Sequence, residues 1–430
     1  MRRAGASARS TGDGAVSISK STGSFPCRRR RSRVMAATRH CPSWTDLQPE
    51  LLTLVLRRLP SLADRIRLAA VCRPWHHSAR LEPLPPPFPW LTLRDGTFLS
   101  VSDGKIHSLP LVQPDNFRCI GSVGNWLLLE QRTGDGASLL MNPFSKDVVH
   151  LPDAETIWCH SHRPVDGYRS PYILLKLVLL SSMDVSPDSV FAILITNCKY
   201  QSVISICQPS TASAFRVLDH DRICDVAFVD GKLYALAPRK LFVLEVESSS
   251  KCKPKISSMK CIANDVIHQT VASEKSICMY FFYLVESSGR LLHVTRLVGG
   301  FLSLSPGKDR TKFCRTFSFD VFEVDLTTSS TVQWRRLNSL EGEALFVGPY
   351  SKALHASEYG VQADCIYFMC DYGGRDCPAD PFRDSGVFNI TNGTITPLLP
   401  ETIMQVPEGI AKGCSIDKFY AARPSWFFVY

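Results

Sequence analysis

Apolar side chains recur at spacings of three and four residues from Leu47 to Leu59, a periodicity that predicts an amphipathic helix with a wide apolar face. Pro60 lacks the backbone N–H that a helix interior needs, so the first helix is predicted to end there. Ser61 and Asp64 have the spacing of a capping box and predict the start of a second helix. The Arg73-Pro74 pair is predicted to end that helix, and a short third helix follows.

This helical unit is expected to need a partner. At about 40 residues it lies near the lower size limit for a domain that folds alone. Its apolar face is also wider than three short helices cover among themselves. The stretch from Leu81 to Trp90 is rich in proline and predicts a stiff spacer between the helical unit and the rest of the chain.

From Leu91 onward, short β-rich runs alternate with turn dipeptides, and helical periodicity almost disappears. A turn with glycine leads into an alternating strand at Asp103-Gly104, Asp230-Gly231, Ser288-Gly289 and, more loosely, Asn392-Gly393. Glycine is favoured in such turns because they need positive φ angles. Repeated hairpins along the rest of the chain predict a β-propeller, whose radial repetition protects the sheet edges. The repeat is irregular and leaves the number of blades open.

The longest apolar run, Tyr172–Leu180, contains Lys176 and is far shorter than the roughly 20 residues that cross a bilayer. We interpret it as a buried strand pair. No membrane span is predicted.

The formal charge of +9 is confined to the N-terminal segment. Residues 1–40 contain ten Lys or Arg residues and one acid, Asp13, so residues 41–430 carry 39 charges of each sign. The folded part is therefore neutral in bulk. Since nothing in it points to phosphate backbones, no nucleic-acid partner is predicted.

The first 40 residues are rich in Arg, Ser and Ala and are predicted to form a disordered basic tail. The run Arg28–Arg33 fits a nuclear import signal. An organellar transit peptide over residues 1–34 fits the same composition. In a third interpretation, translation starts at Met35. All three stay open, and the expected location is the nucleus and/or the cytoplasm unless the tail is a transit peptide.

The 16 cysteines include no C-x-x-C pair, which predicts reduced, mostly buried thiols in the cytosol or nucleus. The stretch Cys159-His160-Ser161-His162 fits no structural zinc spacing and is interpreted as a loop with ordinary side chains. The same holds for Cys365, Cys370 and Cys377, and Cys370 is expected in a strand as a small hydrophobe. No metal site and no cofactor is predicted.

The densest carboxylate cluster consists of Asp371, Asp376, Asp380 and Asp384. Because Gly, Pro and Arg residues lie between these acids, we interpret the segment as a solvated loop and not as a catalytic dyad. The chain contains no G-x-S-x-G, no phosphate-binding Gly-rich loop and no H-E-x-x-H motif. An intrinsic enzyme activity is therefore not predicted.

The residues of the helical unit follow the order of a known module: Asp46-Leu47-Gln48-Pro49-Glu50-Leu51-Leu52, Arg58-Leu59, Leu62-Ala63-Asp64-Arg65, Arg67, Ala70-Val71-Cys72 and Trp75. In this order they resemble an F-box, the module that docks substrate receptors onto the Skp-type adaptor of cullin-RING ubiquitin ligases. Gln48 stands where that family commonly has the proline of its "LP" pair. Pro49 supplies a proline one position later, in the first turn of the predicted helix.

The remainder resembles the plant F-box family whose C-terminal part is the KIB-type β-propeller, also called domain of unknown function 295. The similarity rests on the order of nine stretches: Leu84–Leu93, Gly121–Trp126, Leu140–Phe144, Val229–Ala235, Tyr283–Leu292, Phe319–Asp325, Ala344–Gly348, Cys365–Tyr372 and Asp384–Ile390.

The resemblance implies an α+β multidomain chain, with a small three-helix F-box followed by an all-β propeller. The implied boundaries are a disordered basic tail over 1–40, the F-box over 41–80, a Pro-rich linker over 81–90 and the KIB-type β-propeller over 91–430.

The implied function is that of a non-catalytic substrate-recognition subunit of an SCF-type (Skp-cullin-F-box) E3 ubiquitin ligase. Its partners would be the Skp-type adaptor, through it a cullin, and a target protein held by the propeller. The implied adaptor-binding residues are Leu47, Pro49, Leu51, Leu52, Val55, Leu59, Val71, Cys72 and Trp75. Loops such as Asp371–Asp384 are expected to contact the target from one rim of the propeller.

The alternative is a ligase-independent interaction protein. In that case the F-box is vestigial, and the tail directs the propeller to an organelle.

Overall fold

The computed structural model describes residues 44, 47–59, 62–81, 88–93, 97–102, 104–108, 117–131, 137–161, 172–180, 185–186, 188–197, 201–208, 211–216, 222–249, 252–264, 276–301, 314–326, 332–371, 382, 384–399 and 425–428. The basic tail, the capping residue Ser61, the proline run of the spacer and the acids Asp376 and Asp380 lie outside these residues. The same is true of His162 and Cys377.

Three short helices form the helical unit: α1 (Pro49–Arg57), α2 (Leu62–Ala69) and α3 (Arg73–Leu81). Pro49 begins α1, where its missing N–H costs nothing, and α3 packs against both other helices. The Arg65 side chain ties α2 to the end of α1, because its Nε donates a hydrogen bond to the Leu59 carbonyl at 2.6 Å. Arg73 and Pro74 do not end the second helix as predicted. They form the first turn of α3.

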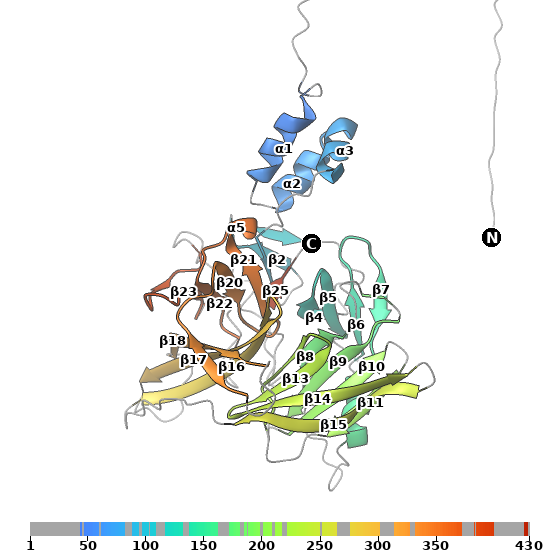
Figure 1. The fold of residues 1–430 in the computed structure, drawn as a ribbon. Coiled ribbons are helices and arrows are strands. Elements are labelled where there is room, and N and C mark those ends of the chain that lie inside the picture. Colours follow the sequence, from blue (N-terminus) through green and yellow to red (C-terminus); the bar gives the residue numbers. More distant parts are fainter. Residues whose placement is uncertain are drawn as a thin grey trace, which may run out of the picture. The chain divides into compact units, whose positions relative to one another are not determined.

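The described strands from residue 90 onward form six sheets, which are the blades of a β-propeller (Figure 1). Blade 1 contains β1 (Trp90–Thr92), β2 (Thr97–Ser100), β3 (Ile106–Ser108) and β25 (Ser425–Phe427). Blade 2 contains β4 (Phe117–Val123), β5 (Trp126–Gln131), β6 (Ser138–Met141) and β7 (Val148–His150). Blade 3 contains β8 (Tyr172–Leu179), β9 (Phe191–Asn197), β10 (Ser202–Gln208) and β11 (Thr211–Arg216).

The other three blades follow in chain order. Blade 4 contains β12 (Asp225–Val229), β13 (Lys232–Ala237), β14 (Lys240–Ser249) and β15 (Cys252–Asn264). Blade 5 contains β16 (Ser276–Ser287), β17 (Arg290–Phe301), β18 (Arg315–Val324) and β19 (Trp334–Leu337). Blade 6 contains β20 (Glu343–Phe346), β21 (Lys352–His355), β22 (Cys365–Phe368), β23 (Gly386–Asn389) and β24 (Ile395–Thr396).

The predicted propeller is confirmed, and the number of blades that the sequence left open is six. The middle strands are buried on both faces because the blades pack face to face. Their sequences are therefore nearly continuous apolar runs, as in β6 and β9. This double burial explains why the alternating pattern is irregular along the chain. The predicted glycine turns are also confirmed, because Gly104, Gly231, Gly289 and Gly393 have φ angles of 65°, 76°, 79° and 70°.

The C-terminal strand closes the ring. β25 pairs antiparallel with β1, and Trp90 lies opposite Phe427 in this register. The Trp426 indole donates a hydrogen bond to the Val347 carbonyl of blade 6 at 3.1 Å. The Trp426 carbonyl accepts one from the Ser122 hydroxyl of blade 2 at 2.6 Å. One strand therefore joins the blades on both sides of blade 1.

Blade 6 departs from the simple meander. β20 pairs parallel with β22, and β21 occupies the position next to β20 at the sheet edge. The short helix α5 (Ala356–Tyr359) lies between β21 and β22 in the chain. The connection from β20 to β21, residues 347–351, is called the bridging segment below.

The bridging segment reaches from blade 6 to blades 2 and 3. Its Tyr350 ring packs in the apolar core that Trp126, Leu177 and Ile193 form with their neighbours, and Tyr350 is hydrogen-bonded to the backbone of Leu177. Burial raises the pKa of the Tyr350 phenol, so the group stays neutral. This contact links blades that are far apart in the chain.

Two further local predictions are wrong. Cys159 lies in a helix, α4 (Ala154–Ser161), and not in a loop. Asp153 stabilises the start of this helix by accepting hydrogen bonds from the Thr156 N–H and hydroxyl, and helix formation lets Ile157 and Trp158 fill the core. The apolar run that starts at Tyr172 is a single strand, β8, and not a strand pair. No helix among the described residues is long and apolar enough to cross a membrane.

Lys352 at the start of β21 is expected to make stability depend on pH. Burial lowers its pKa to about 8, and Glu286 opposes this shift. Below pH 8 the lysine is charged in the folded and in the unfolded protein, and burying the charge lowers the free energy of unfolding. Above pH 8 the folded protein loses the proton first, so stability rises with pH until the unfolded chain also titrates near 10.5.

Lys352→Met should therefore be more stable than the wild type below pH 8 by about 2 kcal/mol, and this difference should shrink as pH rises to 10. Urea denaturation of both proteins at pH 7 to 10 measures the difference between their free energies of unfolding. Titrating groups that the two proteins share contribute equally to both values and cancel in the difference. If the free energies of unfolding of the two proteins change with pH in parallel, Lys352 is not the group that titrates near pH 8.

Candidate functional site

Helix α1 presents an apolar surface to solvent. Leu51, Leu54 and Val55 are 47%, 51% and 44% exposed, and they lie on one face because residues three and four apart align on a helix. Leu52 and Leu56 on the adjacent face are fully buried and hold the helical unit together. The wide apolar face expected from the sequence therefore consists of an interior stripe and an exposed stripe.

The nine predicted adaptor-binding residues separate into three groups in the structure. Pro49, Leu51, Val55 and Val71 are exposed, Leu47, Leu59, Cys72 and Trp75 are half-buried, and Leu52 is buried. The sequence pattern missed Leu54, which is as exposed as Leu51. A helical wheel shows that Leu54 shares the face of Leu51 and Val55, but only the packing shows that this face is the open one.

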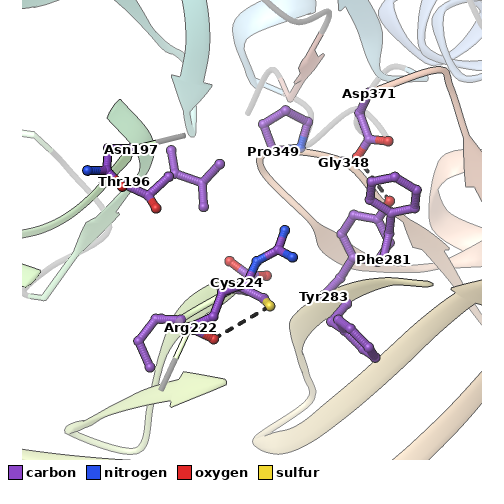
Figure 2. Close-up of a pocket in the computed structure, with 13 residues that line it drawn as sticks. Thr196, Asn197, Arg222, Cys224, Phe281, Tyr283, Gly348, Pro349 and Asp371 are labelled. Atoms are coloured by element: carbon purple, nitrogen blue, oxygen red, sulfur yellow. Dashed lines mark hydrogen bonds between the residues drawn. The ribbon is translucent and has the colours of Figure 1, made fainter. Parts of the chain in front are cut away.

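A pocket of about 140 Å³ lies among blades 3 to 6 of the propeller (Figure 2). The residues that line it belong to strands β8, β9, β12 and β16, to the segments before β12 and after β22, and to the bridging segment. They are Leu175, Thr196, Asn197, Arg222, Ile223, Cys224, Asp225, Phe281, Phe282, Tyr283, Gly348, Pro349 and Asp371. Figure 2 shows Thr196 and Asn197 on one side and Phe281, Tyr283 and Asp371 on the other. The pocket combines carboxylates with aromatic rings.

One carboxylate of the pocket, Asp225, forms an ion pair with a lysine of blade 3. The Lys176 ammonium lies 2.6 Å from Asp225 Oδ1, and both side chains are only 7% exposed. Asp225 also accepts hydrogen bonds from the backbone N–H groups of Val226 and Leu284, each at 2.8 Å. Burial raises the pKa of Asp225, and the lysine and the backbone donors oppose this shift. The pair joins blades 3, 4 and 5.

The second carboxylate, Asp371, belongs to a buried network around Arg296 of β17. The guanidinium of Arg296 donates to Asp371 Oδ1 at 3.0 Å and to Asp384 Oδ2 at 2.8 Å. It lies over the Phe368 ring, with 4.8 Å between the guanidinium carbon and the ring centroid. Burial alone would lower the pKa of Arg296, but attraction from its buried partners outweighs burial and raises it, so the arginine stays charged.

Tyr283 and Thr316 complete this network. The Tyr283 hydroxyl donates to Asp371 Oδ2 at 2.9 Å, the contact drawn as a dashed line in Figure 2. The Thr316 hydroxyl donates to Asp384 Oδ2 at 2.6 Å. Burial and the neighbouring Asp371 charge raise the pKa of Tyr283 well above its usual value, so the phenol keeps its proton and its donor role.

These contacts correct the sequence interpretation of the acidic segment. Asp371 and Asp384 are only 5% exposed and are fixed by Arg296, so the two ends of the segment are not solvated. The sequence could not show this, because Arg296 lies 75 residues from Asp371 and on another blade. Within the described residues no group of three or more potential ligands for a metal ion occurs. Cys365 and Cys370 are buried, as predicted, but Cys370 follows β22 and does not lie in a strand, so that part of the prediction is wrong.

Comparison with known proteins identifies the propeller. The family model of the KIB1-4 β-propeller matches residues 98–389. The chain belongs to the KIB1-4 β-propeller family. The match begins in β2 and ends at the last residue of β23, so it covers strands of all six blades.

Plant proteins are similar to this KIB1-4 family member. It is 28% identical over 125 residues to the F-box protein At4g12382 of Arabidopsis thaliana, a match that covers 28% of this chain and 88% of that protein. It is 32% identical over 121 residues to the A. thaliana F-box protein At3g56470, covering 27% of this chain and 32% of that protein. The resemblance to plant F-box proteins with a KIB-type propeller is thus confirmed.

Among solved structures, a DUF4784 family protein from Bacteroides caccae is 10% identical, with 79% of this chain and 73% of that chain covered. Its TM-score of 0.28 is too low to carry an argument about the fold or function of this chain.

Proposed function

We propose that the protein is the substrate-recognition subunit of an SCF-type E3 ubiquitin ligase. In this proposal helices α1–α3 are the F-box that binds a Skp-type adaptor, and the propeller binds the protein to be ubiquitinated. The observation that carries it is the exposed stripe of Leu51, Leu54 and Val55 on α1. The similarity to plant F-box proteins supports the choice of the adaptor as the partner that covers this stripe.

The exposed stripe has the properties of a docking surface. Val71, between α2 and α3, is 59% exposed and adds a further apolar side chain to the same small unit. Grouped exposed apolar residues typically mark interaction sites, and a few central anchors provide most of the binding energy. The buried Leu52 and Leu56 form a rigid base for these anchors, so little ordering is needed on binding.

In this proposal the protein has no catalytic role of its own. By holding the adaptor at one end and a target at the propeller, it raises the effective concentration of the target near the ubiquitin-transferring subunits. We place this action in the nucleus or the cytoplasm, on the basis of the cysteine pattern.

The test is binding of the full chain to a plant Skp-type adaptor, with and without its cullin. Leu51→Asp is expected to weaken adaptor binding at least about 30-fold, because an anchor of an interface is worth about 2 kcal/mol or more. Val55→Asp should have a similar effect. Both side chains are exposed, so neither charge should disturb folding. Leu59 is a poorer choice, because it is half-buried and its carbonyl binds Arg65.

Phe317→Asp is the matched control, because Phe317 is 58% exposed but lies in β18 of the propeller. It should bind the adaptor like the wild type. If the folded wild type does not bind the adaptor, or if Leu51→Asp and Phe317→Asp have equal effects, the F-box assignment is wrong. The protein would then be an interaction protein that acts without the ligase.

A further inference from the structure

We propose that the pocket among blades 3 to 6 binds the cationic side chain of a lysine or arginine from a partner protein. The inference rests on the proposed function in one respect, since it identifies the pocket as the place where the propeller holds its target.

The first argument is the charge that the wall presents. Asp225 and Asp371 line the pocket, whereas their counter-cations Lys176 and Arg296 are not among the lining residues. A group inside the pocket therefore meets two carboxylates and one basic lining residue, Arg222, while Lys176 and Arg296 lie outside the lining. Such an arrangement favours a donor-rich cation over an anion.

The second argument is spare acceptor capacity. A carboxylate offers about four lone-pair sites. Asp371 accepts hydrogen bonds from Arg296 and Tyr283, one at each oxygen, which leaves about half of these sites for a ligand. The Tyr283 phenol and the Arg296 guanidinium hold the carboxylate in one orientation. The acceptor is thus preorganised, which reduces the ordering cost of binding.

The third argument is the aromatic lining. Phe281 and Tyr283 belong to β16 and lie beside Asp371 at the pocket (Figure 2). Aromatic faces attract ammonium and guanidinium groups, and the attraction is stronger where water is excluded. A volume of about 140 Å³ has room for several waters, and hence for the head group of one long side chain. Carboxylate, rings and size together fit a lysine or arginine side chain.

Arg222 is the one basic residue among the described residues that line the pocket. It is exposed and precedes the buried Asp225, so its charge opposes an isolated cation that enters the pocket. A peptide with an acidic residue beside its basic residue would neutralise this charge while its cation reaches Asp371. Removing the Arg222 charge should therefore strengthen the binding of a simple cationic peptide, whereas an anion site would lose affinity.

The experiment uses the full chain and three blocked tripeptides, acetyl-Gly-Arg-Gly-amide and its citrulline and glutamate analogues, in ligand-observed NMR titrations. Citrulline has the shape of arginine without the charge. We expect saturable binding of the arginine peptide, at least tenfold weaker binding of the citrulline peptide and none of the glutamate peptide. Free arginine serves as a further arm. If it binds as tightly as the peptide or more tightly, the site does not select a residue within a protein segment, and the proposal is overturned.

Two variants complete the test. Arg222→Glu changes an exposed residue and should strengthen binding of the arginine peptide severalfold. Phe281→Leu should weaken it severalfold by removing an aromatic wall. Asp371→Asn is less suitable, because it also removes a partner of Arg296. Binding of the glutamate peptide that Arg222→Glu abolishes would overturn the proposal, as would absence of saturable binding to the folded wild type.

The adaptor-binding experiment and the peptide-binding experiment test the two assignments independently. Leu51→Asp changes the helical unit and should leave peptide binding unchanged, while Arg222→Glu should leave adaptor binding unchanged. A protein that binds the adaptor but not the arginine peptide would disprove only the pocket assignment. The reverse result would disprove only the ligase assignment.

Discussion

Replacing Arg296 with methionine is expected to lower the free energy of unfolding by about 3–5 kcal/mol. Arg296 is fully buried and is bound by two carboxylates that are themselves buried. Removing the guanidinium leaves Asp371 and Asp384 without the cation that compensates them in a poorly solvated environment, and either leaving a charge buried or protonating it is costly. Urea denaturation at neutral pH measures the loss.

Arg335→Met is the control for this substitution. Arg335 pairs with Glu323 on the same blade, but its side chain is 66% exposed. Exposed ion pairs contribute about 0–1 kcal/mol, so this variant should unfold almost like the wild type. Similar losses in the two variants would show that the buried network is not a main source of stability. Arg296→Lys should also be destabilising, since an ammonium does not reproduce the planar fork that binds both carboxylates.

The network bears on function as well as stability. Arg296 joins β17 of blade 5 to Asp371 and Asp384 of blade 6, and Asp371 lines the pocket. A variant that still folds at low temperature should therefore lose the orientation of the Asp371 carboxylate. The ion pairs of Arg296 also fix Asp371 and Asp384, the two ends of the acidic segment.

Gly121→Ala is expected to be the second severe substitution, with a loss of about 3 kcal/mol. An added Cβ at this position would lie 2.0 Å from Cε2 and 2.7 Å from Cζ of the Tyr350 ring. The ring is held in the core between blades 2 and 3 by packing and by the backbone of Leu177, so moving it would disturb that core. Either the bridging segment or strand β4 must shift.

Gly348→Ala in the same bridging segment provides the control. Its added Cβ would have ordinary contacts at 3.8 Å and 3.9 Å with Met369 and Trp426, so the loss should stay below about 1 kcal/mol. Urea denaturation of Gly121→Ala should also be repeated in a Tyr350→Ala background. The glycine substitution should cost much less there, because the clashing ring is gone. Equal costs in both backgrounds would show that the clash with Tyr350 is not the cause.

The family resemblance and the local elements were accessible from the sequence, because both depend on neighbouring residues. The helical period from Leu47 to Leu59 predicted α1, and the glycine turns at Gly231 and Gly289 predicted hairpins that the structure confirms. Errors occurred where burial on both faces removes the alternation, as in β8, or where a capped helix such as α4 lies between strands.

The sequence by itself indicated the type of most elements, α4 and β8 excepted, and also the propeller architecture and the family, since period, turn residues and motifs are properties of short segments. Only the tertiary structure decided the number of blades, the exposed stripe of α1 and the residues that form the pocket. The reason is that these features depend on contacts between distant segments. β1 and the closing strand β25 are hydrogen-bonded across 333 residues, and Arg296 meets Asp384 across 88. No periodicity along the chain records such pairings, because they exist only once the ring of blades has closed.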